Sequence, residues 1–182
     1  MENNKIELLA AYFTISGDIY PFGPTEISPF DFQYRVEAAA NAGYKGLGFV
    51  HADLMDTAER IGFKEMKNIL DSNGITKVEF EFLGGWYEKG KLRDQSDKMR
   101  KEMLAAADIL NPINIKVGPT LDIDERDNNI PLMVEEFTKL KKLGVVGVKV
   151  DFFESEKQNM IQYYLDILED AAAHHLLINF HG

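Results

Sequence analysis

Short apolar stretches alternate along this chain with longer segments of helical spacing. The stretches with strand character are Leu8 to Ile15, Gly46 to Val50, Lys77 to Phe82, Ile113 to Val117, Val146 to Asp151 and Leu176 to Phe180. They recur about every 30 to 36 residues, which is the size of a unit of one strand and one helix. Strands and helices that alternate in this way favour parallel strands joined by right-handed crossovers.

Helix signals fill the intervals between these strands. In the first helix Ser28 is expected as N-cap, Pro29 as the first helical residue and Gly43 as terminator. The other predicted helices run from about Phe63 to Asp71, from Asp97 to Ile109, from Pro131 to Gly144 and onward from the capping box Ser155-Glu156-Lys157-Gln158. The order of elements therefore predicts an α/β fold.

Several predicted strands have one apolar and one polar face, because side chains alternate along a strand. In the third strand Glu79 and Glu81 alternate with apolar residues, and polar residues take the same positions in three later strands: Asn114, Lys116, Lys149, Asp151, Asn179 and His181. An open doubly wound sheet would have strands that are apolar on both faces. The first strand is also not followed by a phosphate-binding GxGxxG or GxxxxGK[ST] motif.

We therefore predict a parallel (β/α) barrel of the TIM-barrel type, shortened to about six βα units and forming a single domain over residues 1–182. A barrel of eight units typically needs about 250 residues. Six units either close into a compact small barrel or leave open sheet edges that pair in a homodimer.

Composition and charge narrow the classes of protein. The 182 residues include 20 basic and 30 acidic side chains, and the net charge of −10 argues against nucleic acid as a partner. The absence of cysteine excludes disulfides, thiolate zinc sites and cysteine nucleophiles. The first residues lack signal-peptide features, and no apolar run approaches the roughly 20 residues of a membrane span. We therefore expect a cytoplasmic protein with no membrane partner.

Residues from about 8 to 140 resemble the xylose-isomerase-like barrels of the sugar phosphate isomerase/epimerase branch. The matching stretches are Pro29-Phe30-Asp31-Phe32, Arg35 to Ala40, Gly46 to Leu54, Leu70 to Ile75, Val78 to Leu83 and Ile115-Lys116-Val117-Gly118. This resemblance implies a metal-dependent sugar isomerase, whose metal ligands come mainly from the second half of the barrel.

Residues from about 145 to 182 resemble glycoside hydrolase family 97, the calcium-using barrel α-glucosidases and α-galactosidases. The matching stretches are Gly147 to Phe153, Gln158 to Tyr164, Asp166 to Ala172 and Asn179 to Gly182. Two resemblances in one chain suggest a recombined, engineered barrel. Its isomerase-like segment would cover residues 1–140 and its hydrolase-like segment residues 145–182, with the change of family near Lys141 to Gly144.

The hydrolase resemblance implies that Asp151 is the catalytic nucleophile, since in retaining members the Asp of the matching Lys-x-Asp-Phe stretch has this role. Retaining hydrolysis also needs a second carboxyl group about 5 to 5.5 Å away. The family's acid and calcium-binding glutamates lie largely outside the matching stretches. The alternative is that Asp151 pairs with Lys149 or Lys116 inside the barrel.

Catalytic groups of a barrel lie at the carboxyl ends of its strands. We select Glu81 as the second catalytic candidate, although Glu79 and Glu81 could equally hold a metal ion or balance lysines in a buried polar network. The substrate-binding candidates are His51, Trp86, Lys149 and His181. No residue is assigned to a metal.

Because the two catalytic sets are incomplete, the leading hypothesis is an engineered barrel with no evolved catalytic activity and no cofactor. The first alternative is a sugar (phosphate) isomerase/epimerase that depends on a divalent metal. A further alternative is a glycoside hydrolase, or a carbohydrate-binding domain that stacks a sugar on Trp86.

Overall fold

The computed structural model describes residues 7–21, 23–117, 134–135, 138–139, 141–142, 147–150 and 158–180. The chain divides into two compact units, which are described here one at a time. The first consists of Met1–Phe82 and Lys98–Lys116, and the second of Leu83–Asp97 and Val117–Gly182.

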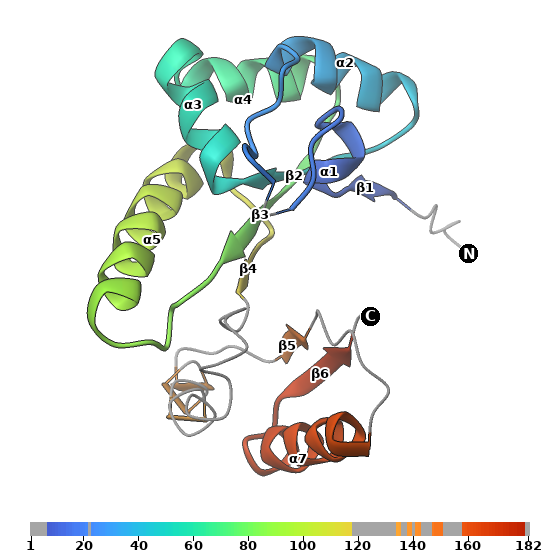
Figure 1. The fold of residues 1–182 in the computed structure, drawn as a ribbon. Coiled ribbons are helices and arrows are strands. Elements are labelled where there is room, and N and C mark those ends of the chain that lie inside the picture. Colours follow the sequence, from blue (N-terminus) through green and yellow to red (C-terminus); the bar gives the residue numbers. More distant parts are fainter. Residues whose placement is uncertain are drawn as a thin grey trace. The chain divides into compact units, whose positions relative to one another are not determined.

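A four-stranded sheet lies at the centre of the first unit (Figure 1). Its strands are β1 (Leu9–Ala10), β2 (Gly46–Val50), β3 (Lys77–Leu83) and β4 (Asn114–Val117), in the order β1-β2-β3-β4. β1 pairs with β2 and β2 with β3 in parallel. The register places Gly48 opposite Glu79 and Val50 opposite Glu81. The α/β fold with a parallel sheet is thus confirmed.

Helices follow and cover these strands. They are α1 (Tyr12–Ile15), α2 (Phe32–Asn41), α3 (His51–Ile61), α4 (Phe63–Ser72) and α5 (Gly90–Leu110). α3 continues directly from β2, and α4 packs against both α2 and α3, as Figure 1 shows. Gly43 and Gly74 follow α2 and α4 at φ angles of 94° and 68°, a conformation that glycine adopts without steric cost.

The apolar core of the first unit lies between the sheet and these helices. Leu47, Phe49, Val78 and Phe80 are buried on one face of the sheet. The Phe49 ring lies 5.6 Å from the ring of Phe32 in α2. Each such side chain contributes about 1.5–3 kcal/mol when it is fully buried. Because side chains alternate along a strand, Glu79 and Glu81 lie on the opposite face.

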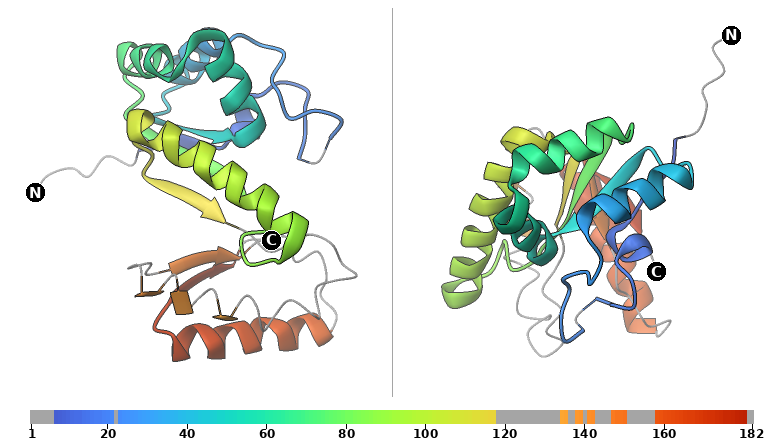
Figure 2. Two further views of the ribbon diagram at one scale, coloured as in Figure 1. Left: turned by 90° about the vertical axis from the view of Figure 1, so that its left-hand side faces the viewer. Right: turned by 90° about the horizontal axis from the view of Figure 1, so that it is seen from above.

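The second unit contains a βαβ arrangement. Its elements are β5 (Gly147–Val150), α7 (Gln158–Ala173) and β6 (Leu177–Phe180). The two strands are parallel, with Lys149 opposite Asn179. α7 packs on β6, as Figure 2 shows. Residues 134–135, 138–139 and 141–142 are helical, within the helix predicted from Pro131. Ser155, the start of the predicted capping box, lies outside the described residues.

Three local predictions were wrong. The stretch Leu8 to Ile15 is a strand only at Leu9–Ala10, because the Tyr12 amide donates to the Glu81 side chain and Thr14 N bonds back to Ala11 O. Residues His51–Ile61 form the helix α3, although the sequence predicted no helix there.

The third concerns the start of α2, which begins at Phe32 and not at Pro29. Ser28 does not cap this helix, because Asp31 occupies the N-cap position; the Ser28 hydroxyl accepts the Phe30 amide at 3.2 Å in the turn before the helix and donates to the carbonyl of Ser16. The described strands form one four-stranded and one two-stranded sheet. Closure of six units into one barrel, and the single domain over residues 1–182, remain predictions. None of the described helices is long and apolar enough to cross a membrane.

Candidate functional site

Polar side chains from β3 and β4 meet on the face of the sheet that carries Glu79 and Glu81. Lys116 Nζ lies 2.5 Å from Glu79 Oε1 and 3.5 Å from Glu81 Oε2. Asn114 Nδ2 donates to the second Glu79 oxygen at 3.4 Å. The side chains of Glu79, Glu81 and Lys116 are 9%, 13% and 26% exposed. One ammonium group thus lies between two largely buried carboxylates and offsets their mutual repulsion.

Glu81 is also held from the start of α1. The backbone amide of Tyr12 donates to Glu81 Oε1 at 2.9 Å. This approach depends on Gly48 in β2, where a Cβ atom would lie 1.8 Å from Glu81 Oε1 and 3.1 Å from the Tyr12 amide nitrogen. Any larger residue at position 48 must displace the carboxylate. A glycine inside a strand often marks such a close approach, and this is the signal that could have identified Gly48 from sequence.

His51 lies directly after β2 as the first residue of α3. Its Nε2 is 2.8 Å from Glu102 Oε2 of α5, and the two side chains are 21% and 34% exposed. Lys98 Nζ approaches the other Glu102 oxygen at 3.9 Å. His51 thus has a carboxylate partner that sequence analysis did not predict. Its role in substrate binding remains a prediction.

Trp86 is 8% exposed and belongs to the second unit. Its ring contacts that of Tyr87 edge to face, with centroids 5.1 Å apart. A ring on which a sugar stacks must expose one face, so binding to Trp86 would require this pair to open. The role of Trp86 in sugar binding stays a prediction.

The three other candidates are Lys149, Asp151 and His181. The backbone of Lys149 lies in β5, and Asp151 and His181 fall outside the described residues. The chain places Asp151 directly after Val150, the last residue of β5. The roles proposed for these residues therefore remain predictions.

A buried ion pair in the first unit was not predicted. Arg35 Nη2 donates to Asp53 Oδ2 at 2.8 Å, with the two side chains 2% and 1% exposed. The other Asp53 oxygen accepts the Ser28 amide at 2.9 Å. The available signal was a charged residue in the buried stripe of α2, next to Val36 and between Phe32 and Ala39, since such a residue needs a buried partner.

Tyr12 lies beside this ion pair and is fully buried. Its hydroxyl donates to the carbonyl of Glu26 at 2.6 Å. Burial, and after it the negative charge of Asp53, raises the pKa of Tyr12 well above its usual value near 10. The phenol therefore stays protonated and acts as a donor.

Within the part of the chain that the structure describes, no three His, Asp or Glu side chains gather closely enough to hold a metal ion. This observation does not test whether the protein uses a cofactor, and the expectation that it uses none remains a prediction. The Glu79, Glu81 and Lys116 cluster is instead suited to hydrogen bonding and to stabilising positive charge, since it combines two fixed carboxylates with one donor.

Comparison with known proteins assigns the chain to a class of sugar-cleaving enzymes. The sequence profile described as "Glycoside hydrolase 97" matches residues 53–182, which is more than half of the chain. The chain belongs to this family. The match begins at Asp53 and includes Glu79, Glu81, Lys116 and Asp151.

Two similar proteins are glycosidases by description. A "Probable retaining alpha-galactosidase" from Streptomyces bingchenggensis (strain BCW-1) is 56% identical over 43 residues, which are 24% of this chain and 7% of that protein. A solved structure titled "Crystal structure of beta-arabinopyranosidase" is 22% identical with a TM-score of 0.33, and the alignment covers 95% of this chain and 22% of that one. This chain thus spans only a small part of the length of each of these two proteins.

These findings correct the leading hypothesis. The bounds of the profile match, residues 53–182, include Lys141 to Gly144, where a change of family was expected. The engineered barrel without evolved activity was therefore the wrong interpretation, and the glycoside hydrolase alternative is favoured. Neither the isomerase-like resemblance nor the recombination of two parents is supported by the comparisons.

Proposed function

We propose that this chain carries part of the catalytic centre of a retaining glycoside hydrolase that acts on a terminal α-linked galactose. The observation that carries this proposal is the family match over residues 53–182, which includes every charged member of the β3–β4 cluster. The retaining α-galactosidase description of the Streptomyces relative supports the choice of sugar and of stereochemistry.

Asp151 is the proposed nucleophile. It follows β5 directly, and the residues at the carboxyl ends of parallel strands supply the chemistry in barrels of this type. Attack of its carboxylate on the anomeric carbon would expel the aglycone and form a glycosyl ester, which water then cleaves with overall retention.

Glu81 is the proposed second carboxylate, with a role in stabilising charge. Lys116 Nζ lies 3.5 Å from Glu81 Oε2, and the Tyr12 amide donates to Glu81 Oε1 at 2.9 Å, so both carboxylate oxygens are held in place. A carboxylate fixed in this way is suited to stabilising positive charge. Donation of the leaving-group proton is then the task of another group.

Glu79 and Lys116 are proposed to position Glu81. Both carboxylates contact the same ammonium group, so Glu79 and Lys116 together restrict where the Glu81 side chain can lie. Without the Lys116 ammonium group, the negative charges of the two carboxylates would repel each other and move the side chains apart.

The test is hydrolysis of 4-nitrophenyl α-galactoside by the full chain. We expect activity that falls by at least about 10³-fold in Asp151→Gly and by about 10²-fold in Glu81→Gln, magnitudes typical of a lost nucleophile and a lost charge-stabilising group. The matched control is Glu59→Gln, which neutralises an exposed carboxylate of α3 and should leave the rate unchanged.

A second readout tests the nucleophile directly. Added azide should restore turnover of the Asp151→Gly variant and yield β-galactosyl azide, because the small anion attacks from the side that the carboxylate has vacated. Hydrolysis that gives a product of inverted configuration, or that Asp151→Gly leaves unchanged, would refute the proposal.

A further inference from the structure

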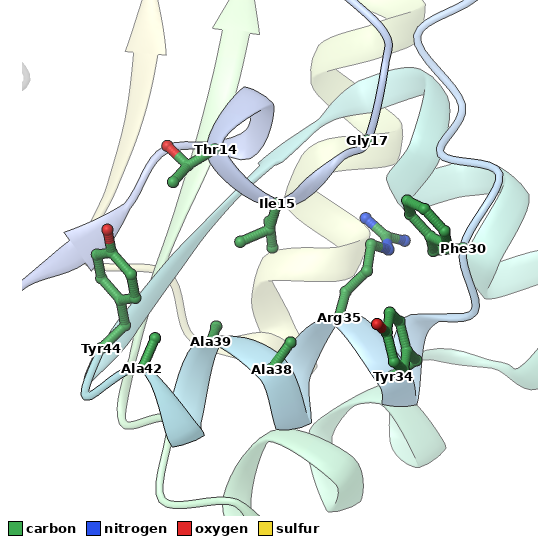
Figure 3. A pocket seen from close by; sticks show the side chains of 10 residues that line it. All are labelled: Thr14, Ile15, Gly17, Phe30, Tyr34, Arg35, Ala38, Ala39, Ala42 and Tyr44. Carbon is green, nitrogen blue, oxygen red and sulfur yellow. The ribbon is translucent and has the colours of Figure 1, made fainter.

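A pocket of about 370 Å³ lies between α1 and α2 of the first unit. Figure 3 shows Ala38 and Ala39 of α2, and Ala42 directly after this helix, lining one wall, with Ile15 of α1 facing them. The aromatic side chains of Phe30, Tyr34 and Tyr44 also line the pocket. All lining residues fall between positions 14 and 44, before the family match begins at residue 53, so the pocket is independent of the proposed function.

Arg35 supplies the charged group of this pocket. The residue is only 2% exposed. One of its nitrogens, Nη2, donates to Asp53. Among the residues that the structure describes, its Nε and Nη1 atoms have no hydrogen-bond partner. A buried donor without an acceptor is costly, so these N–H groups favour any ligand that brings an oxygen to them.

The surroundings of Arg35 determine the direction from which an acceptor can approach. The rings of Tyr12 and Phe32 each lie 5.8 Å from the guanidinium carbon. Both distances are in the range of cation–π contacts. Nε and Nη1 belong to different edges of the planar group, so a single acceptor oxygen takes a hydrogen bond from only one of them.

The charge of Arg35 is already balanced. Asp53 is fully buried and lies 2.8 Å away, so a second carboxylate beside the guanidinium would be repelled by Asp53 and would lose its hydration. A neutral oxygen acceptor satisfies one of the free N–H groups without this cost. The alanine and aromatic walls in turn favour an apolar body that fills the pocket.

We propose that this pocket binds a neutral, ring-shaped small molecule with an apolar body and one carbonyl oxygen, which accepts a hydrogen bond from Arg35. Phe30 controls access to the guanidinium. In Figure 3 its ring and the Arg35 side chain point to the same end of the pocket. Phe30 is 45% exposed and packs against Gly17, so its ring can turn outward with little loss of packing.

The experiment uses three probes of similar size and different acceptor chemistry. Acetophenone carries a neutral carbonyl, benzoate a carboxylate, and ethylbenzene no oxygen. Each is titrated into the full chain while the methyl resonances of Ala38 and Ala42 and the side-chain N–H resonances of Arg35 are followed by NMR. We expect acetophenone to bind at least about tenfold more tightly than either other probe, and to shift the Arg35 resonances.

A blocking variant locates the binding. Ala38 is exposed on α2, so Ala38→Leu fills the pocket without burying a new polar group. We expect it to weaken acetophenone binding by at least about tenfold. Ala105→Leu, the same change at an exposed position of α5, should leave binding unchanged.

Three outcomes would overturn the proposal. Equal affinity for acetophenone and ethylbenzene would mean that Arg35 takes no part in binding. Tighter binding of benzoate would mean that the site selects anions. Resonance shifts that survive Ala38→Leu, or that do not saturate, would mean that the probe binds elsewhere or without a defined site.

Discussion

Lys116 Nζ and Glu79 Oε1 are 2.5 Å apart and join two neighbouring strands across 37 residues of sequence. The same ammonium group reaches Glu81, so two carboxylates depend on one positive charge. The contact is therefore both a structural link within the sheet and the centre of the proposed catalytic cluster.

Replacement of Lys116 tests this dependence. Lys116→Met should lower the free energy of unfolding by about 2 kcal/mol, less than for a fully buried pair because the lysine is partly exposed. Glu79→Gln added to that variant should restore about 1 kcal/mol or more, since it removes the uncompensated repulsion. Urea denaturation of the four members of this cycle measures the coupling. Strictly additive effects would contradict it, and Lys67→Met, which removes an exposed pair with Asp71, serves as control.

The ion pair of Arg35 and Asp53 should be the most sensitive polar contact of the first unit. Asp53→Asn preserves the shape of the side chain but leaves the Arg35 charge unpaired at 2% exposure. We expect a loss of about 3–5 kcal/mol in the free energy of unfolding. Asp56→Asn removes an exposed carboxylate paired with Arg60 and should cost a few tenths of a kcal/mol. Similar effects of the two changes in denaturation experiments would show that burial of the pair contributes nothing.

Gly48 should be intolerant of any side chain. Gly48→Ala places a methyl group where the Glu81 carboxylate now lies, so the hydrogen bond from the Tyr12 amide must break. The expected cost is about 1–3 kcal/mol in thermal or urea denaturation. In a Glu81→Ala background only the 3.1 Å contact with the Tyr12 amide nitrogen remains, so the same glycine substitution should cost markedly less. An equal cost in both backgrounds would show that the destabilisation does not come from a steric conflict with the Glu81 side chain.

We predict that the free energy of unfolding falls at alkaline pH because of Tyr12. Its pKa is raised in the folded state by burial and by Asp53, so above pH 10 the unfolded chain releases a proton that the folded chain retains. The free energy of unfolding should then fall by about 1.4 kcal/mol per pH unit from this group alone.

The matched variant is Tyr12→Phe. It should be less stable than the unaltered protein by about 1 kcal/mol at pH 7, because the hydrogen bond to the Glu26 carbonyl is lost. Between pH 10 and 11 the difference should shrink or reverse in denaturant titrations. A difference that stays constant with pH would show that Tyr12 ionises normally.

Sequence periodicity was sufficient to predict the β3–β4 cluster. Glu79, Glu81 and Lys116 each occupy a polar position between apolar neighbours, so a two-residue period places them on one face. Parallel pairing of neighbouring strands then brings them together. This inference needed no information from outside the two strands.

Contacts made by loops and by the starts of helices could not be predicted in this way. Ser28 has the sequence signature of an N-cap, but its amide bonds to Asp53, 25 residues further along the chain. Arg35 likewise finds its partner 18 residues away. Local propensity contains no information about such partners, because tertiary contacts decide between the hydrogen bonds that a serine or an arginine could make.

The pairing of Arg35 with Asp53 also bears on how this chain can be shortened. The family match starts at Asp53, yet both oxygens of that carboxylate are bonded to residues that precede the match. A version trimmed to residues 53–182 would retain a buried negative charge and lose the groups that balance it. The border of the family profile is therefore not a border of autonomous folding, and cloning boundaries should be placed upstream of Ser28.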